Sequence, residues 1–317
     1  QGTLSPPPVH SNLASLFPPR SDPTFHLPGY KDPYLKYADI YKLANAGLAI
    51  EKLNQLKTLE PSNTAIDKKL AEIYYLKNDF SKAADAYSRF AMGPKANEED
   101  LVRYAFALFL NHDFAKSLEV ANMGLKKNPR HAAFNRLAMY NNTDLKRFEE
   151  ALKAADVFFN ECDKADYSYL DYMYYGHLLE ELKKYDEAVG QYEKAVELDP
   201  TKTDLYKNIS SVYEQKNDYK KAIGAYHKYY SSLEKEKQTP DLQFQLGRLY
   251  YGAGTQPDSL TINVEERKQA LMSADSVFQV ISEAAPDSYL GNFWRARANS
   301  ALDPETTQGL AKPFYEE

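Results

Sequence analysis

Residues 78–83 read NDFSKA, and four later stretches follow the same pattern: HDFAKS (112–117), KRFEEA (146–151), KKYDEA (183–188) and NDYKKA (217–222). The aromatic residues of successive stretches are 34, 34, 37 and 34 residues apart. A small side chain, alanine or serine, follows three positions after each of them. A regular period of this length indicates a repeat architecture, in which each repeat packs mainly on its two neighbours.

Each repeat predicts two helices joined by a short polar turn. Apolar residues at helical spacing precede the turn, as in LAEIYYL (70–76). The second helix runs from the aromatic residue to a proline, as in YDEAVGQYEKAVELDP (185–200), because proline cannot continue a helix. We expect the helices to cross at small residues: Ala38, Ala49, Ala71, Ala83, Ala105, Ser117, Ala151, Gly176, Ala188, Ser210, Ala222, Gly247, Ala274, Ala296 and Ala311. Bulky residues, with Tyr315 the last of them, fill the space one turn away.

The stretch 169–200, YLDYMYYGHLLEELKKYDEAVGQYEKAVELDP, resembles the tetratricopeptide repeat family nearly throughout. Tyr172 stands at the usual tryptophan position, and Gly176, Ala188, Tyr192 and Pro200 follow at family positions. The resemblance implies an all-α fold, a right-handed α-solenoid of about eight helix-turn-helix repeats with 15 or 16 helices after residue 30. We place the repeats at about 31–63, 64–97, 98–131, 132–168, 169–202, 203–239, 240–288 and 289–317, the last being incomplete.

Two segments depart from the repeat pattern. Residues 1–30 contain SPPPVH and LFPPRSDP, and this proline density favours an extended arm. The arm is either a leader or a segment that docks on the concave face over Tyr75, Phe106, Phe109 and Tyr140. The seventh repeat carries an insertion at 255–269. There Asn263 and Glu266 predict a reciprocal cap, followed by a helix over 264–284 that extends beyond the array.

Composition excludes several classes of function. The net charge of −6 argues against a nucleic-acid partner, and no apolar run is long enough to span a bilayer. Cys162 is the only cysteine, and no histidines stand at metal-ligand spacing. The chain contains no phosphate-binding, zinc-protease or nucleophile-elbow motif, so we predict no catalytic residue, no metal and no cofactor. If a signal segment preceded Gln1, we expect export to a bacterial periplasm, and otherwise a cytoplasmic protein.

The resemblance also implies where a ligand lies, because family members bind peptides against the first helices of their repeats. The corresponding positions here are Lys68, Tyr75, Phe106, Phe109, Arg136, Tyr140, Met173, His177, Lys207, Arg248, Tyr251 and Arg297. The lysine–asparagine set with which some members grip a terminal carboxylate is absent, since Glu72 follows Lys68 at the asparagine position. Tyr75, Phe106, Phe109 and Tyr140 predict an apolar strip with charged neighbours.

Two functions remain open from the sequence. The first is a non-catalytic scaffold or adaptor that binds a peptide or protein segment in the concave groove. The alternative is a structural subunit of a larger assembly, for example at a cell envelope, that contacts partners through its edges, its long seventh-repeat helix and its C-terminal end. Self-association through the N-terminal arm or the open C-terminal end belongs to the same set of expectations.

Overall fold

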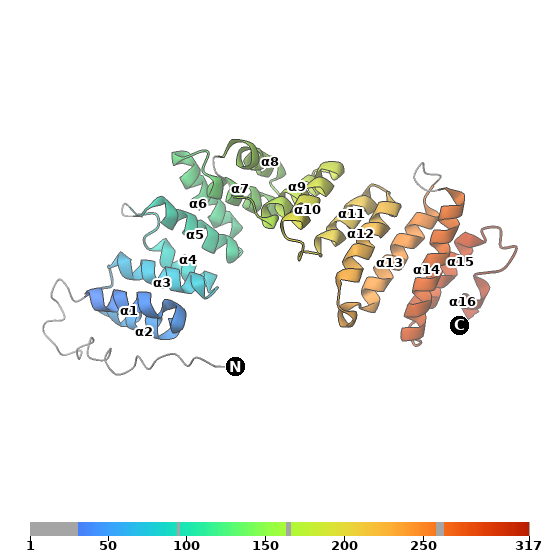
Figure 1. The fold of residues 1–317 in the computed structure, drawn as a ribbon, viewed down its shortest axis with the longest axis horizontal. Helices are drawn as coiled ribbons and strands as arrows, with labels where there is room; N and C mark the ends of the chain where they lie inside the picture. The colour runs from blue at the N-terminus through green and yellow to red at the C-terminus, as the bar shows by residue number, and fades with distance from the viewer. Residues whose placement is uncertain (1–30, 94–95, 163–165, 258–262, 317) are drawn as a thin grey trace, which may run out of the picture. The chain divides into compact units, whose positions relative to one another are not determined.

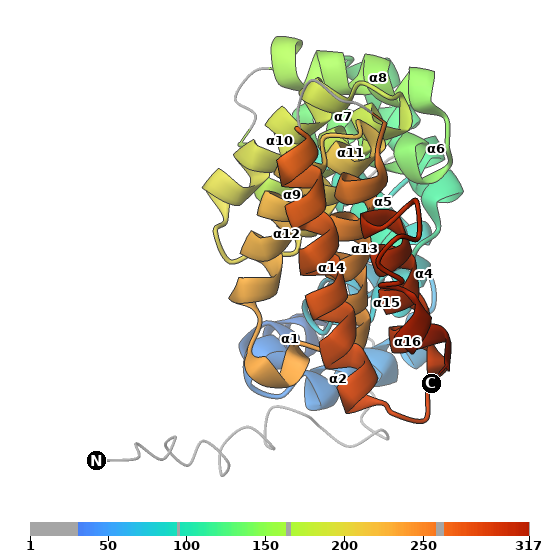
Figure 2. The same ribbon diagram turned by 90° about the vertical axis from the view of Figure 1, so that its right-hand side faces the viewer.

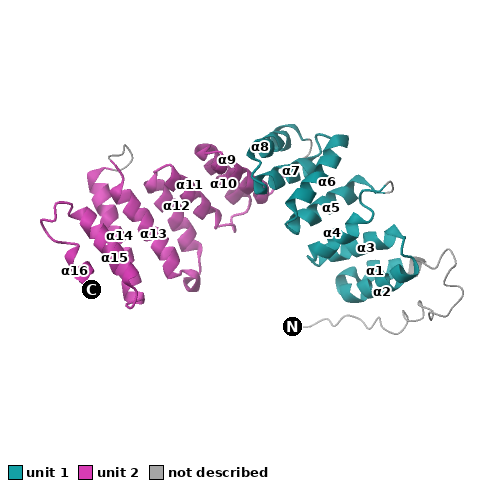
Figure 3. Ribbon diagram, turned by 180° about the vertical axis from the view of Figure 1, so that it is seen from behind, with its two compact units in different colours: residues 1–165 teal, residues 166–317 magenta. Residues whose placement is uncertain are grey.

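The computed structural model describes residues 31–93, 96–162, 166–257 and 263–316. Over these residues the chain forms sixteen α-helices and no β-strand, so the predicted all-α fold with 15 or 16 helices is confirmed (Figure 1). The predicted N-terminal arm lies outside the described residues. No helix among the described residues has the length and apolarity to cross a membrane. The chain divides into two compact units, residues 1–165 and 166–317 (Figure 3).

Compact unit 1 holds the first eight α-helices. They are α1 (Lys31–Ala44), α2 (Ala46–Leu59), α3 (Thr64–Leu76), α4 (Phe80–Ser88), α5 (Glu98–Leu110), α6 (Phe114–Lys127), α7 (Ala132–Asp144) and α8 (Phe148–Asp156). A π-helical turn, η3 (Val157–Glu161), continues α8. Each odd-numbered helix packs on the even-numbered helix that follows it, and each even-numbered helix up to α6 packs on the next odd-numbered one.

Compact unit 2 repeats this scheme, and its two longest helices form its third pair. Its helices are α9 (Tyr169–Glu181), α10 (Tyr185–Leu198), α11 (Leu205–Gln215), α12 (Tyr219–Ser232), α13 (Pro240–Thr255), α14 (Val264–Ala284), α15 (Tyr289–Leu302) and α16 (Lys312–Glu316). A 3₁₀ turn, η4 (Lys235–Lys237), follows α12. The first helices of the last two pairs, α13 and α15, also contact each other directly.

The short turn between the two helices of a repeat has the same backbone conformation in five successive repeats. Its middle residue is left-handed each time, with φ between 58° and 61°, at Asn78, His112, Lys146, Lys183 and Asn217. The next residue is the N-cap of the second helix, and where it is aspartate its carboxylate accepts a hydrogen bond from the backbone N–H three positions on. Arginine or lysine replaces that aspartate after Lys146 and Lys183, and these two helices have no side-chain cap.

Small residues lie at the helix crossings as predicted, with one exception. Ala188 and Ala222 are fully buried, and a methyl group on Gly176 would approach the buried Tyr192 ring to 2.8 Å. The exception is the C-terminal end. Ala311 lies in the turn before α16, only half-buried, and Tyr315 is 65% exposed, so the predicted crossing there is wrong. A five-residue helix is too short to place both residues against α15.

The insertion in the seventh repeat builds paired helix extensions. Asn263 and Glu266 form the predicted reciprocal cap, and α14 runs over residues 264–284 as expected. The added turns of α14 lie beside the end of α13 (Figure 2), where Ala270 and Leu271 are buried. The Lys220 ammonium, on α12, lies 3.1 Å from the Glu266 carboxylate. The start of α14 is thus held by α12 and α13 and does not project alone.

Candidate peptide-binding surface

In compact unit 1, two of the four residues of the predicted aromatic strip are buried in the core. Tyr140 is 2% exposed and Phe109 is 8% exposed, and their ring centroids are 5.5 Å apart. The structure therefore corrects the prediction that both present their rings to a ligand. Tyr75 and Phe106 are half-buried, and burial raises the pKa of the Tyr75 phenol despite the nearby positive charge of Arg103.

The two cations expected on this surface in unit 1 have partners within the chain. The Lys68 ammonium lies 2.7 Å from the carboxylate of Asp100, a buried residue that forms a reciprocal cap with Asn97 at the start of α5. The Arg136 guanidinium lies over the Phe158 ring, 5.0 Å from its centroid. Both side chains stabilise neighbouring elements, so unit 1 offers a ligand fewer free groups than its sequence indicates.

In unit 2 the corresponding positions on α9 and α11 are more accessible. His177 and Lys207 are exposed, whereas Met173 packs against the core cluster around Tyr192. The Glu180 carboxylate accepts hydrogen bonds from the Tyr192 hydroxyl at 2.9 Å and from the Gln215 amide at 2.7 Å. Burial and this negative charge raise the pKa of the Tyr192 phenol far above its usual range. Glu180 is thus fixed in place between two neighbours.

The most developed surface lies on α13 and α15 and consists of aromatic rings around one arginine. The Arg297 guanidinium lies over the rings of Trp294, Tyr251 and Phe293, at 4.8, 5.2 and 5.9 Å from their centroids. Trp294 also stands edge-on to Tyr251 and to Phe244. We call these five residues the aromatic–arginine cluster. Contacts with these rings restrict the motion of the guanidinium, and Arg297 stays exposed.

The surroundings of this cluster are poor in carboxylates. Helix α15 has no acidic residue, and the only one on α13 is Asp241, in its first turn. Arg248, one position before the buried Leu249, is exposed and lies 3.9 Å from the Glu214 carboxylate of α11. Among the described residues no carboxylate lies within ion-pair distance of Arg297. The site therefore has an unneutralised cation beside exposed aromatic surface.

Sequence reasoning found the arginines of this surface but missed its central ring. Trp294, the only tryptophan in the chain, contacts Arg297 and Tyr251 but is not among the predicted ligand positions. Tyr289, at the start of α15, is 79% exposed and extends the aromatic surface. Their aromatic character was the available signal. A helix of fourteen residues with four aromatic or arginine side chains between 293 and 297 and no acid is unusual for a solvated helix.

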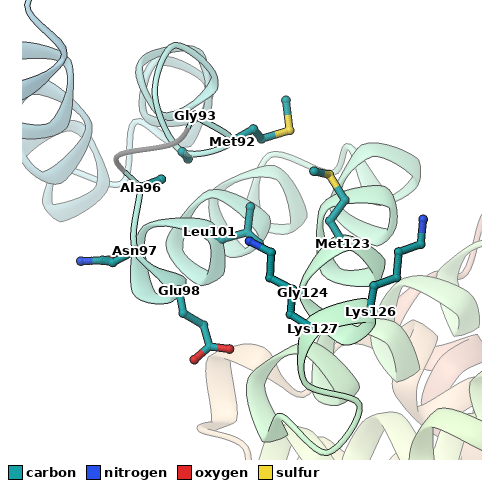
Figure 4. Close-up of a pocket in the computed structure, with 11 residues that line it drawn as sticks. Met92, Gly93, Ala96, Asn97, Glu98, Leu101, Met123, Gly124, Lys126 and Lys127 are labelled. Carbon is teal, nitrogen blue, oxygen red and sulfur yellow. The ribbon is translucent and has the colours of Figure 1, made fainter.

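Unit 1 also has a hollow on another side (Figure 4). It measures about 340 Å³ and lies between the end of α4, the start of α5 and the end of α6. Met92 lines it from the segment after α4, Glu98 from the start of α5, and Met123, Lys126 and Lys127 from α6. The hollow is separate from the first-helix positions that the family resemblance indicates.

Comparison with known proteins agrees with this architecture. The tetratricopeptide repeat model matches residues 170–202. The C-terminal part of a repeat-containing protein of this type from Cytophaga hutchinsonii is 31% identical, over 68% of this chain and 76% of that chain, with a TM-score of 0.52. A tetratricopeptide repeat protein from Parabacteroides merdae is 16% identical over 84% of this chain and 98% of that chain, with a TM-score of 0.54.

A further solved structure matches a smaller part of this chain. MamA from Desulfovibrio magneticus is 18% identical over 56% of this chain and 97% of that chain, with a TM-score of 0.48. No curated protein sequence matches the chain.

Proposed function

Since the chain belongs to the tetratricopeptide repeat family, we propose that it is a non-catalytic scaffold that binds a peptide or protein segment. The segment lies along the first helices of compact unit 2, and the aromatic–arginine cluster of α13 and α15 is its main anchor. Repeat arrays of this kind serve as interaction surfaces because successive helices present side chains in register. Among the described residues no three His, Cys, Asp or Glu side chains are grouped as metal ligands would be.

The observation that carries this proposal is the environment of Arg297. Binding energy at protein interfaces is concentrated in a few aromatic and arginine residues near the centre of a patch. Arg297 is exposed, its guanidinium lies within 6 Å of the centroids of three aromatic rings, and it has no carboxylate within ion-pair distance among the described residues. A fixed guanidinium loses less side-chain freedom on binding than a mobile one, so it is suited to a bidentate carboxylate contact.

Neighbouring helices give this surface a consistent charge. Lys207 on α11 and Arg248 on α13 stand at family ligand positions, as Arg297 does on α15, and the only acidic residues of these three helices are Glu214 and Asp241. Charge complementarity therefore favours a ligand segment with carboxylate side chains. Phe293 is 40% exposed and offers apolar contact beside the cations. We infer a ligand with an acidic residue over Arg297 and an apolar residue against Phe293.

The test is a binding experiment on the full chain. A random dodecamer peptide library is selected against the protein, and the dissociation constant of the best peptide is measured by calorimetry. We expect Arg297→Ala and Phe293→Ala each to weaken binding at least tenfold, about 1.4 kcal/mol. Lys268→Ala removes an exposed cation from α14 and serves as the matched control. Equal affinity of the wild-type protein and both cluster variants would contradict the proposed site.

A second candidate function, a subunit of a larger assembly, is favoured by one feature of α14. Met272 and Val280 are about half exposed and lie two turns apart on the same side of this helix. Apolar residues in this arrangement suit contact with another helix. If α14 carries the main interaction, Met272→Glu with Val280→Glu abolishes assembly in sedimentation experiments, while the affinity for a selected peptide stays unchanged.

A further inference from the structure

At two glycines of unit 2, no neighbouring atom would prevent a larger side chain. Gly190 of α10 and Gly224 of α12 lie inside their helices, and a methyl group built on either meets no atom within 4 Å. By contrast, the same methyl group on Gly176, Gly247 or Gly252 would come within 3 Å of an aromatic ring. Glycine is less stable than alanine inside a helix, and packing does not explain its presence at either position.

At Gly224 that empty space is a pocket. It measures about 260 Å³ and lies between α11 and α12. Ile209 and Ala225, both buried, belong to its base, and both are part of the core cluster of this region. The lining residues are Glu193, Tyr206, Ile209, Tyr213, Lys221, Gly224, Ala225 and Lys228. Pockets that enclose small molecules measure about 300–1,000 Å³, so this one suits a single side chain.

Two tyrosine–lysine pairs frame the pocket at its two ends. The Lys228 ammonium lies 5.2 Å from the centroid of the Tyr206 ring, and the Lys221 ammonium lies 5.3 Å from that of Tyr213. Within each helix the two members are seven residues apart, so they lie on one side of it with Gly224 between the lysines. Any side chain at position 224 would occupy the space between the two pairs.

The preceding repeat contains only half of this frame. Thirty-four residues earlier, Tyr172 and Lys194 form an equivalent pair, with the ammonium 5.7 Å from the ring centroid, and Gly190 corresponds to Gly224. At the other end, Leu179 and Glu187 replace tyrosine and lysine. Gly190 therefore has open space beside one tyrosine–lysine pair and not between two, which makes it a natural control for Gly224.

Charge around the pocket defines the ligand. Helix α12 carries Lys220, Lys221 and Lys228 and no carboxylate. Lys221 has an ion pair at 3.3 Å with Asp218, the residue that caps α12. Among the described residues no carboxylate lies within ion-pair distance of Lys228. Glu193, the one acidic lining residue, comes from α10 on the opposite side. The α12 side thus attracts a carboxylate.

We propose that this framed pocket is a second docking site, which receives one bulky apolar side chain from an acidic segment of a partner protein. The apolar side chain enters between Tyr206 and Tyr213, over Ile209, and a neighbouring carboxylate of the same segment pairs with Lys228. The pocket is lined by a different face of α11 from the one that carries Lys207 and Ser211. This site is independent of the aromatic–arginine cluster, and the chain then contacts two partners, or two segments of one partner.

Three short peptides test the site on the isotope-labelled full chain. They are acetyl-Glu-Phe-Glu-amide, acetyl-Glu-Ala-Glu-amide and acetyl-Lys-Phe-Lys-amide, and the readout is the NMR shift of the backbone amides of Gly224 and Ala225. We expect saturable shifts with the first peptide and at least fivefold weaker binding of the other two. Equal binding of the alanine peptide, or of the lysine peptide, would overturn the proposal.

Substitutions separate this site from the first-helix surface. Gly224→Leu fills the pocket and should weaken the Glu-Phe-Glu peptide at least tenfold at the Ala225 amide, while Gly190→Leu leaves its affinity unchanged. Lys228→Glu should reverse the preference towards the lysine peptide. Arg297→Ala should leave the shifts at Gly224 intact even if it abolishes binding elsewhere. Circular dichroism establishes that each variant folds, and wild-type affinity in folded Gly224→Leu would refute the proposed site.

Discussion

The same substitution, glycine to alanine, should have opposite effects at two helical positions. A methyl group on Gly124 of α6 would lie 2.1 Å from the nearest carbon of the Phe134 ring, whereas on Gly190 of α10 it would meet nothing within 4 Å. Non-bonded carbon atoms prefer about 3.5–4.0 Å, so the Phe134 ring must retreat by more than 1 Å. That ring is fully buried and packs against His131, with centroids 4.5 Å apart, which leaves it little room.

The magnitudes follow from two opposing contributions. Alanine in place of glycine favours the helix by about 0.8–1 kcal/mol, and overpacking a core costs about 1–3 kcal/mol. With a displacement this large we expect the overpacking cost to lie in the upper part of that range. The free energy of unfolding should then fall by about 1–2 kcal/mol in Gly124→Ala and rise by about 0.5–1 kcal/mol in Gly190→Ala.

Hydrogen exchange measured by mass spectrometry suits a repeat array, because it reports the opening free energy of each helix and requires no two-state unfolding. Exchange should accelerate in α6 and α7 of Gly124→Ala and slow in α10 of Gly190→Ala. The reasoning is refuted if Gly124→Ala protects α6 as well as glycine does, or if Gly190→Ala weakens α10.

Four further outcomes are expected. Ala188→Phe and Ala222→Phe should each lower the free energy of unfolding by about 1–3 kcal/mol or more in urea titrations, because both sites are fully buried helix crossings; unchanged curves would show a wrong register. Lys183→Gly should raise the free energy of unfolding by about 1 kcal/mol, because Lys183 has a left-handed backbone conformation that is strained for any residue with a side chain; a loss of stability would contradict this. Burial alone would raise the pKa of Asp303, but hydrogen bonds from the backbone amides and the threonine hydroxyl of residues 307–310 lower it. The loop after α15 should therefore be fully ordered above the usual aspartate pKa and lose its amide NMR shifts only as pH falls through the lower, folded value; loss at higher pH would refute the linkage. Residues 141–143 read Asn-Asn-Thr, which matches the acceptor pattern for N-linked glycosylation, but the Asn141 side chain is fully buried. The folded chain should therefore carry no glycan at Asn141 after expression in a glycosylating host, and a glycopeptide that includes it would contradict this burial.

Much of the fold follows from features local to one repeat. The 34-residue period depends on the turn, which five successive repeats form with the same left-handed residue, and on alanines that need only their own helix partner. The long helix α14 was predictable to the residue because Asn263 and Glu266, which begin it, are three positions apart in sequence. The packing at the C-terminal end was not predictable in this way. Whether Tyr315 packs against α15 depends on the length of α16, and no local sequence signal sets that length.

The site was harder to predict, because exposure depends on several helices at once. Phe109 and Tyr140 occupy family ligand positions, yet each ring covers the other and both are buried. Lys68 is neutralised by Asp100 from the next repeat, a pairing that neither sequence segment shows alone. The frame of the pocket at Gly224 consists of two tyrosines of α11 and two lysines of α12, so periodicity alone does not indicate it.

The central claim is that a peptide lies along the first helices of unit 2. The most direct test is hydrogen exchange of the full chain with and without a saturating selected peptide. The account predicts slower exchange in α11, α13 and α15, strongest around Trp294 and Arg297 on α15, and no change in α14. Slower exchange confined to α14, or to unit 1, with α13 and α15 unaffected, would contradict it.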